Sequence, residues 1–193
     1  MNDMLVATRA WPRVKWTRAA QVAPLLGDTP TLEAVAAMSP SAAFAVLRES
    51  DPTGATHFLA QCLSRIDAVR WVLAGLTLVE PSPPPARAVA AKAVRRWVAT
   101  PSDEARRLAH EAGAIAGWDT VEGLACLSVF LSGGSMAPAA QEIPVNPQPG
   151  IFGKVVASTI LTAALAAGGA VFDERINTLL DTADAIAAGE QSA

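Results

Sequence analysis

The feature that most constrains this chain is an uncharged stretch that runs from Val155 to Phe172. Seven of its eighteen residues are strongly apolar, and they would contribute about −2 to −4 kcal/mol to membrane insertion. The other eleven are Ala, Gly, Thr and Ser, and the stretch is at the short end of the range that spans a bilayer. We therefore predict a helix inside a protein core. The alternative is a membrane-associated protein anchored by this stretch.

Composition indicates an all-α fold. Alanine, leucine and arginine favour helices, whereas the β-branched and aromatic residues do not cluster as strands would need. A chain of 193 residues can bury a sizeable core. We predict a single-domain bundle of about eight helices, an arrangement that stacked helical hairpins would satisfy. Twelve Arg against three Lys, with abundant Ala, is typical of bacterial genomes rich in G and C.

Two proline-rich linkers, residues 80–85 and 136–150, divide the predicted bundle. The first separates an N-terminal helical subunit with a basic arm (1–80) from a C-terminal helical subunit (86–193), within one compact domain, and the second lies inside the C-terminal subunit. Capping signals and apolar periodicity predict helices at 17–26, 31–38, 41–50, 51–78, 86–99, 101–116, 119–131, 151–170 and 173–188. We expect 119–131 and 151–170 to form the core, Gly168-Gly169 to interrupt the latter, and Asp173 to cap the last helix.

The charge distribution and the cysteines limit the function classes. The net charge of −3 argues against a dedicated nucleic-acid binder. Residues 1–111 are net basic and residues 112–193 net acidic, so the halves either face each other or present a dipolar surface to a charged partner. Cys62 and Cys126 lie in apolar runs without CxxC spacing, which is typical of reduced core residues. The first sixteen residues have no apolar region of signal-peptide length, so we expect a cytoplasmic protein.

The sequence contains no recognisable catalytic, cofactor or metal motif. His57 and His110 each lack a second ligand at helical spacing. The run from Ser132 to Ser135 lacks the Lys-Ser/Thr of a phosphate-binding loop, and a GxSxG motif is absent. We predict no catalytic residue, no cofactor and no metal. An enzyme built on a helical scaffold, with a site of unrecognised type, stays open as an alternative.

A basic group on two consecutive predicted helices is the best candidate for a contact surface. If the helices form a hairpin, their cationic side chains make one patch for an acidic protein partner. The alternative is that they pair with nearby Asp103, Glu104 and Glu111. The predicted protein-binding members of this group are Arg95, Arg96, Arg106 and Arg107.

Trp11 and Trp16 lie in the basic, proline-containing N-terminal arm, where periodicity does not bury them. Tryptophan and arginine are enriched among the residues that dominate binding energy at interfaces. Both tryptophans are therefore predicted to bind a partner, with docking onto the protein's own helices as the alternative.

The run RRWV at residues 95–98, TPSDEARR at 100–107, Trp118 and FLSGGSMAP at 130–138 resembles an uncharacterised bacterial family of helical proteins. The resemblance covers about residues 86–189 and is associated with gene neighbourhoods of type VI secretion systems. It implies a helical fold and no known activity. From these observations we expect a non-catalytic protein that binds other proteins, as an adaptor or accessory factor of a bacterial secretion system. We expect it to bind neither nucleic acid nor membrane.

Overall fold

The computed structural model describes residues 9–27, 30–138 and 140–190. Within these residues the chain forms nine α-helices and three short 3-10 helices and contains no strand, which confirms the predicted all-α bundle. In chain order the elements are η1 Ala19–Gln21, α1 Ala23–Leu26, η2 Pro30–Val35, α2 Pro40–Ser50, α3 Pro52–Cys62, α4 Arg65–Leu76, α5 Pro85–Ala99, α6 Asp103–Ala116, α7 Val121–Leu131, α8 Ile151–Leu165, η3 Gly169–Val171 and α9 Phe172–Ala187.

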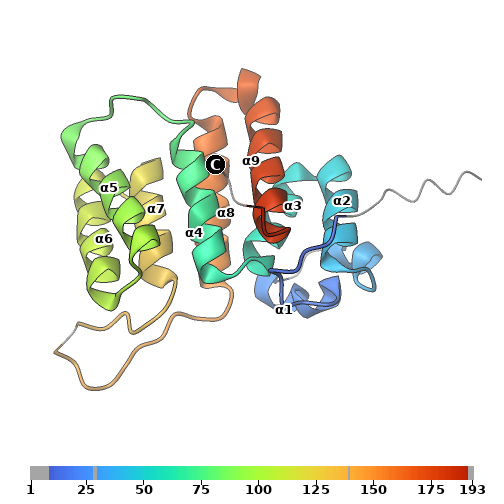
Figure 1. The fold of residues 1–193 in the computed structure, drawn as a ribbon, viewed down its shortest axis with the longest axis horizontal. Helices are drawn as coiled ribbons and strands as arrows, with labels where there is room; N and C mark the ends of the chain where they lie inside the picture. The colour runs from blue at the N-terminus through green and yellow to red at the C-terminus, as the bar shows by residue number, and fades with distance from the viewer. Residues whose placement is uncertain (1–8, 28–29, 139, 191–193) are drawn as a thin grey trace, which may run out of the picture.

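The helices are arranged in a row of packed groups (Figure 1). Helices α5, α6 and α7 pack against one another at one end, α4 and α8 lie in the middle, and α9, α3 and α2 follow. Helix α8, which contains most of the uncharged stretch, contacts α3, α4, α7 and α9. Its buried residues are small or β-branched, among them Val156, Thr159 and Ile160, so the neighbouring helices approach it closely. The first part of the uncharged stretch, up to Ala164, therefore packs in the core as predicted, whereas residues 165–170 are exposed, which corrects the prediction for the rest of the stretch.

Helix α8 is shorter than the predicted helix 151–170. It ends at Leu165, and Gly168 adopts φ +94°, a left-handed conformation that a helix cannot continue through. The predicted interruption at Gly168-Gly169 is confirmed. The prediction that Asp173 caps the last helix is wrong, because η3 leads directly into α9 and Val171 is its N-cap. Asp173 instead lies in the first turn, where its charge complements the helix dipole.

No single helix among the described residues is both long enough and apolar enough to cross a bilayer. Helix α8 and the segment Gly169–Ala187 reach the length and hydropathy of a membrane span only when they are taken together, and the chain bends by 105° between them.

The predicted helix 51–78 is wrong in one respect, because it is two helices. Helix α3 ends at Cys62, Leu63 is extended, and α4 begins at Arg65. The hydroxyl of Ser64 accepts a hydrogen bond from the backbone N–H of Asp67 at 3.3 Å and donates to the Asp67 carboxylate at 2.6 Å. This cap starts a new helix and turns α4 away from α3.

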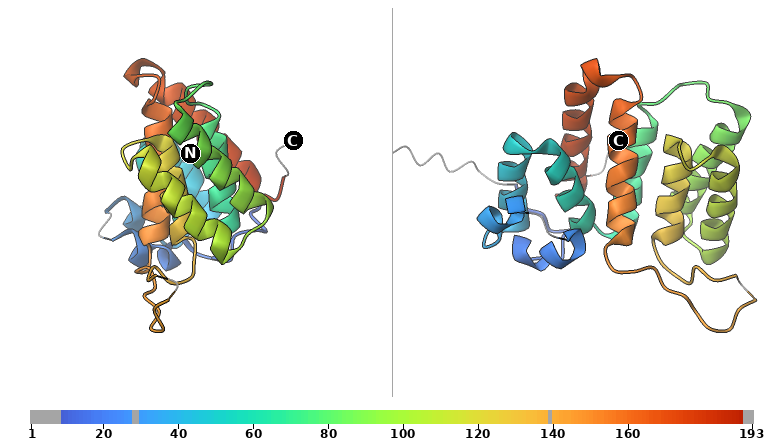
Figure 2. Two further views of the ribbon diagram at one scale, coloured as in Figure 1. Left: turned by 90° about the vertical axis from the view of Figure 1, so that its left-hand side faces the viewer. Right: turned by 180° about the vertical axis from the view of Figure 1, so that it is seen from behind.

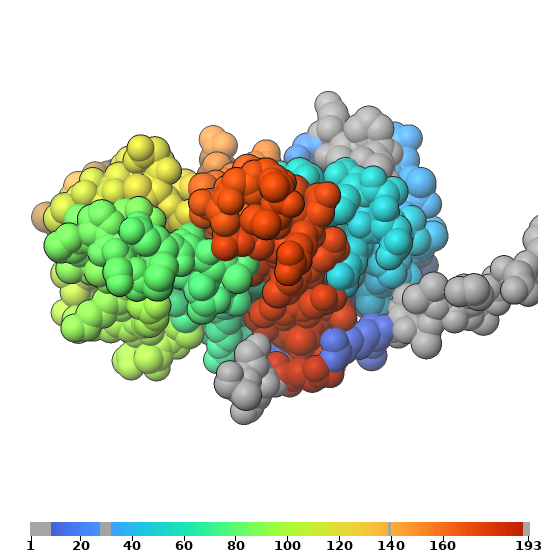
Figure 3. All heavy atoms as spheres, turned by 90° about the horizontal axis from the view of Figure 1, so that it is seen from above, coloured from blue at the N-terminus to red at the C-terminus, as the bar shows by residue number. Residues whose placement is uncertain are grey.

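The N-terminal region is less helical than predicted. Residues 17–26 form two short helices, η1 and α1, and the predicted helix 31–38 is the 3-10 helix η2. Residues 9–18 precede them without helical structure and lie along the C-terminal end of α9, where Arg13 N–H donates to the carbonyl of Ala187. The space-filling view shows this contact between the N-terminal and C-terminal parts of the chain (Figure 3).

Candidate functional site

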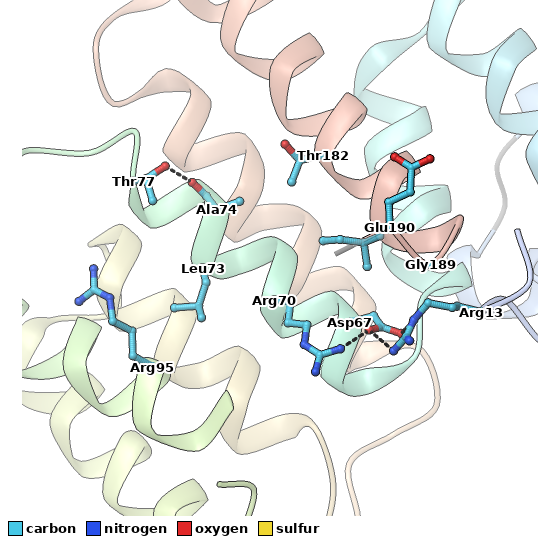
Figure 4. A pocket seen from close by; sticks show the side chains of 11 residues that line it. Arg13, Asp67, Arg70, Leu73, Ala74, Thr77, Arg95, Thr182, Gly189 and Glu190 are labelled. Carbon is cyan, nitrogen blue, oxygen red and sulfur yellow. Dashed lines mark hydrogen bonds and ion pairs between the residues drawn. The ribbon is translucent and has the colours of Figure 1, made fainter. Parts of the chain in front are cut away.

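An open groove of about 780 Å³ lies over helix α4. Helix α4 forms its floor, α5 and α9 form its sides, and the N-terminal arm closes one end (Figure 4). The side chains that line it are a mixture of cationic, acidic, hydroxyl and apolar groups, namely Arg13, Asp67, Arg70, Leu73, Ala74, Thr77, Arg95, Thr182, Ile186 and Glu190 together with Gly189.

The closed end of the groove is built around the carboxylate of Asp67, whose side chain is only 2% exposed. Arg13 donates to it from Nε at 3.0 Å and from Nη2 at 2.7 Å, and Arg70 donates from Nη1 at 3.0 Å. Burial alone would raise the pKa of Asp67. Hydrogen bonds from Arg13, Ser64 and Arg70 outweigh burial and hold that pKa below its usual value. Asp67 is therefore a satisfied anion that fixes two guanidinium groups in place.

The open part of the groove retains cationic groups that have donors to spare. Arg70 uses one nitrogen on Asp67, and its side chain is 48% exposed. Arg95 is exposed, and no acidic side chain within the described ranges lies within ion-pair distance of it. Glu190 is bound by Arg9. Because the apolar floor at Leu73 separates the two arginines, the groove can receive an extended or helical segment that combines carboxylates with an apolar side chain.

Of the predicted basic group, only Arg95 reaches this groove. Arg96 is exposed on α5 but does not line the groove. Arg106 is 3% exposed, and it donates to the carbonyls of Phe130 and Ser135, each at 2.8 Å. The idea that all four arginines form one exposed patch is therefore wrong, because Arg106 holds the loop that follows α7 in place.

Arg107 belongs with Arg106 and not with the groove. Its Nε donates to Asp103 at 2.8 Å and its Nη1 to the carbonyl of Ala137 at 2.9 Å. Hydrogen bonds from Arg107 and then from Arg106 lower the pKa of Asp103. Arg106 and Arg107 both pair with Asp103, which is the alternative that the sequence left open.

The two tryptophans of the arm dock onto the protein's own helices. Trp11 is buried, its Nε1 donates to Asp184 at 2.6 Å, and its ring lies 5.3 Å from that of Phe44. Trp16 is half-buried, and its Nε1 donates to the carbonyl of Gln61 at 3.1 Å. Both side chains therefore dock on the protein's own helices, which was the alternative to partner binding, and neither lines the open part of the groove.

The histidines and cysteines are dispersed. The ring of His110 lies 4.1 Å from that of Phe130 and 5.4 Å from that of Trp118, while burial lowers the pKa of His57. Cys62 and Cys126 are both buried as free thiols. Across the residues that the structure describes, no three His, Cys, Asp or Glu side chains are grouped closely enough to hold a metal ion.

Sequence reasoning missed three of the residues that build the groove, Arg13, Asp67 and Arg70. A local signal existed for two of them. Ser64 and Asp67 have the S-x-x-D spacing of a helix start, and Asp67 and Arg70 have the i, i+3 spacing of an ion pair. Arg13 lies 54 residues away from Asp67, so no local pattern links the two.

Comparison with known proteins gives a family. No curated protein and no solved structure matches the chain. One family model matches residues 42–187, about three quarters of the sequence, and it begins well before the resemblance at residues 86–189. The chain therefore belongs to DUF6931, a family of unknown function.

Proposed function

We propose that this protein is a non-catalytic interaction protein that binds an acidic segment of another protein in the groove over α4. We place it in the bacterial cytoplasm as an adaptor or accessory factor of a secretion system. The link to secretion rests on the resemblance of residues 86–189 alone. The choice of site rests on the pair of accessible guanidinium groups, Arg70 and Arg95, on either side of an apolar floor.

Charge supports an acidic occupant. Three arginines line the groove, Arg13, Arg70 and Arg95, whereas its two carboxylates, Asp67 and Glu190, are already bound by arginines. A guanidinium group presents up to five N–H donors. Arg95 can therefore bind a carboxylate through two parallel hydrogen bonds, and Arg70 can use the nitrogens that Asp67 does not occupy. An incoming carboxylate would meet donors without displacing an existing ion pair.

The apolar floor of the groove favours a peptide segment, rather than a small ion, as the ligand. Leu73, Ala74 and the aliphatic part of α9 near Ile186 line the space between the charged groups. Covering an apolar side chain there contributes roughly 25 cal/mol per Å² of buried surface. A segment with Asp or Glu on both sides of a Leu, Ile or Met would use the apolar floor and both arginines at once.

Binding of a defined probe tests the site. We would titrate the protein into a short fluorescein-labelled peptide of alternating Glu and Leu and follow fluorescence anisotropy. Arg95→Ala should raise Kd about fivefold, which corresponds to about 1 kcal/mol, and combining it with Arg70→Ala should raise Kd about 30-fold. The same peptide with Gln in place of Glu should bind much more weakly.

Arg96→Ala is the matched control, because Arg96 is the next residue on the same helix, carries the same charge and does not line the groove. Its Kd should stay within about twofold of the wild type, since it contributes only long-range attraction that salt screens. Equal losses for the Arg95 and Arg96 variants would mean non-specific attraction and would contradict the proposed site.

The secretion role needs its own experiment. Quantitative affinity capture from the native host, with the wild type and the Arg70→Ala/Arg95→Ala variant in parallel, would compare the bound proteins. We expect an acidic component of a secretion system to be captured by the wild type and lost with the variant. If the groove variant loses only proteins unrelated to secretion, the adaptor role is wrong while the groove assignment stands.

A further inference from the structure

The outer face of the α5–α6 hairpin is a second surface with unused binding groups. The two helices are antiparallel, are joined by residues 100–102, and pack on α7 through their inner sides. Seen from that end of the molecule, both helices face the viewer and no other helix lies in front of them (Figure 2, left). Several large apolar side chains are exposed there, above all Val89 at 58% and Ile115 at 76%.

Helical spacing places these apolar residues in two stripes. On α5, Val89, Lys92 and Arg96 follow one another at i, i+3 and i+7, and all three are exposed. On α6 the exposed residues at i, i+4, i+7 and i+11 are Glu104, Leu108, Glu111 and Ile115. The α5 stripe is therefore cationic with an apolar end, and the α6 stripe alternates acidic and apolar residues and also ends on an apolar one.

The charges of both stripes have no ion-pair partner among the residues that the structure describes. Lys92 and Arg96 form no ion pair with any acidic side chain of the described segments. Glu104 and Glu111 likewise form no ion pair with any described cationic side chain, although the two stripes belong to the same hairpin. By contrast, Arg87 on α5 and Asp103 on α6 are both paired.

We propose that a second copy of this chain docks on this face, with the α5 stripe of each copy against the α6 stripe of the other. A two-fold axis parallel to the helices, running between α5 and α6, produces this isologous arrangement. Residues equally far from the turn of an antiparallel hairpin lie at the same height. Arg96 of one copy then faces Glu104 of the other, Lys92 faces Glu111, and Val89 faces Ile115.

The size of the face sets the strength of the dimer. Helices of fourteen and fifteen residues are about 21–23 Å long, and two side by side are about 20 Å wide. Each copy therefore buries about 450 Å², or about 900 Å² for the pair, which is the size of a weak and transient interface. We expect a dimer that forms only at micromolar concentrations or above. The face is separate from the groove, because neither Arg70 nor Arg95 belongs to either stripe.

Sedimentation velocity of the full chain, over a range from about 1 to about 500 μM, tests the proposal. The wild type should change from monomer to dimer within this range. Two charge-reversed variants, Lys92→Glu/Arg96→Glu and Glu104→Lys/Glu111→Lys, should each be monomeric, with Kd raised at least tenfold, because like charges then face each other. Helical circular dichroism, together with a wild-type Kd for the acidic peptide at high salt, where long-range charge effects are screened, would show that each variant remains folded with an intact groove.

Mixing the two variants tests directly whether the α5 stripe of one copy pairs with the α6 stripe of the other. One has two cationic stripes and the other has two anionic stripes, so an equimolar mixture should form a heterodimer although each variant alone does not. This result cannot come from damaged folding. A wild type that stays monomeric throughout, a dimer unaffected by the reversals, or a mixture that fails to associate would each overturn the proposal.

Discussion

The guanidinium group of Arg13 donates two hydrogen bonds to the carboxylate of Asp67, at 3.0 and 2.7 Å, although the two residues are 54 positions apart. The pair ties the N-terminal arm to the first turn of α4 and closes one end of the groove. Because Asp67 is almost completely buried, its charge must stay paired, and the groove and the stability of the fold therefore depend on the same contact.

Asp67→Asn should lower the free energy of unfolding at pH 7 by about 1–3 kcal/mol, since it removes a charge that accepts hydrogen bonds from two arginines. The folded-state pKa of Asp67 is lowered, so its contribution is present above the unfolded pKa of about 3.9 and is lost as the pH falls through the folded value. The difference between wild type and variant should thus shrink in acid. Urea unfolding at neutral pH and near pH 3 measures it. Asp181→Asn, at an exposed ion pair, should have little effect at either pH.

Trp11→Ala should destabilise the fold by about 3 kcal/mol, because the indole is buried and packs on Phe44. Trp11→Phe keeps most of the packing and removes the hydrogen bond to Asp184, so it should cost about 1 kcal/mol. Thermal and urea unfolding provide the measurement. If the alanine variant is as stable as the wild type but loses a binding partner, Trp11 contacts that partner and does not anchor the arm.

Arg106 and Arg107 are adjacent and should respond very differently to substitution. Arg106→Ala should lower the free energy of unfolding by about 3 kcal/mol, because it leaves the buried carbonyl of Phe130 without its charged donor. Arg107→Ala should cost roughly 1 kcal/mol, since its partner Asp103 is exposed and its own side chain is 24% exposed. Urea unfolding of both variants compares them directly. Equal costs would mean that the loop after α7 does not depend on Arg106.

Both thiols should be unreactive in the folded protein. Burial raises the pKa of Cys62 far above its ordinary value, and burial together with Glu122 raises that of Cys126 to about 12. The thiolate is the reactive form, so iodoacetamide at pH 8 should modify neither residue in the folded state and both in urea. Mass spectrometry of the alkylated protein counts the modified sites. Rapid modification of either cysteine under native conditions would point to a local opening of the α3–α8 or α5–α7 contact.

The parts of the fold that were predictable depended on local signals. Ser39 and Asp51 precede prolines and cap the helices that follow, and helix α8 ends shortly before the two glycines of the uncharged stretch. The break between α3 and α4 was missed, because apolar spacing continues through it from Cys62 to Val69. The Ser64 cap outweighs that continuity.

The candidate site was less predictable, because its geometry depends on which way neighbouring side chains turn. Arg95 and Arg96 are equivalent by type, yet a rotation of about 100° per residue sends only the first into the groove. The sequence predicts that Arg106 is a surface cation, but its guanidinium group is buried against the carbonyl of Phe130 on α7 and that of Ser135 in the following loop. Neither outcome can be read from spacing along one helix.

The docking of the arm has a consequence for how the chain folds during synthesis. Trp11 and its partner Asp184 are 173 positions apart in the chain. At about 5–20 residues per second, the arm waits on the order of 10–30 s on the ribosome without its partner on α9. During that interval Phe44 is already available to the indole, but its hydrogen-bond acceptor is not, so the burial of Trp11 is completed only when α9 has been made.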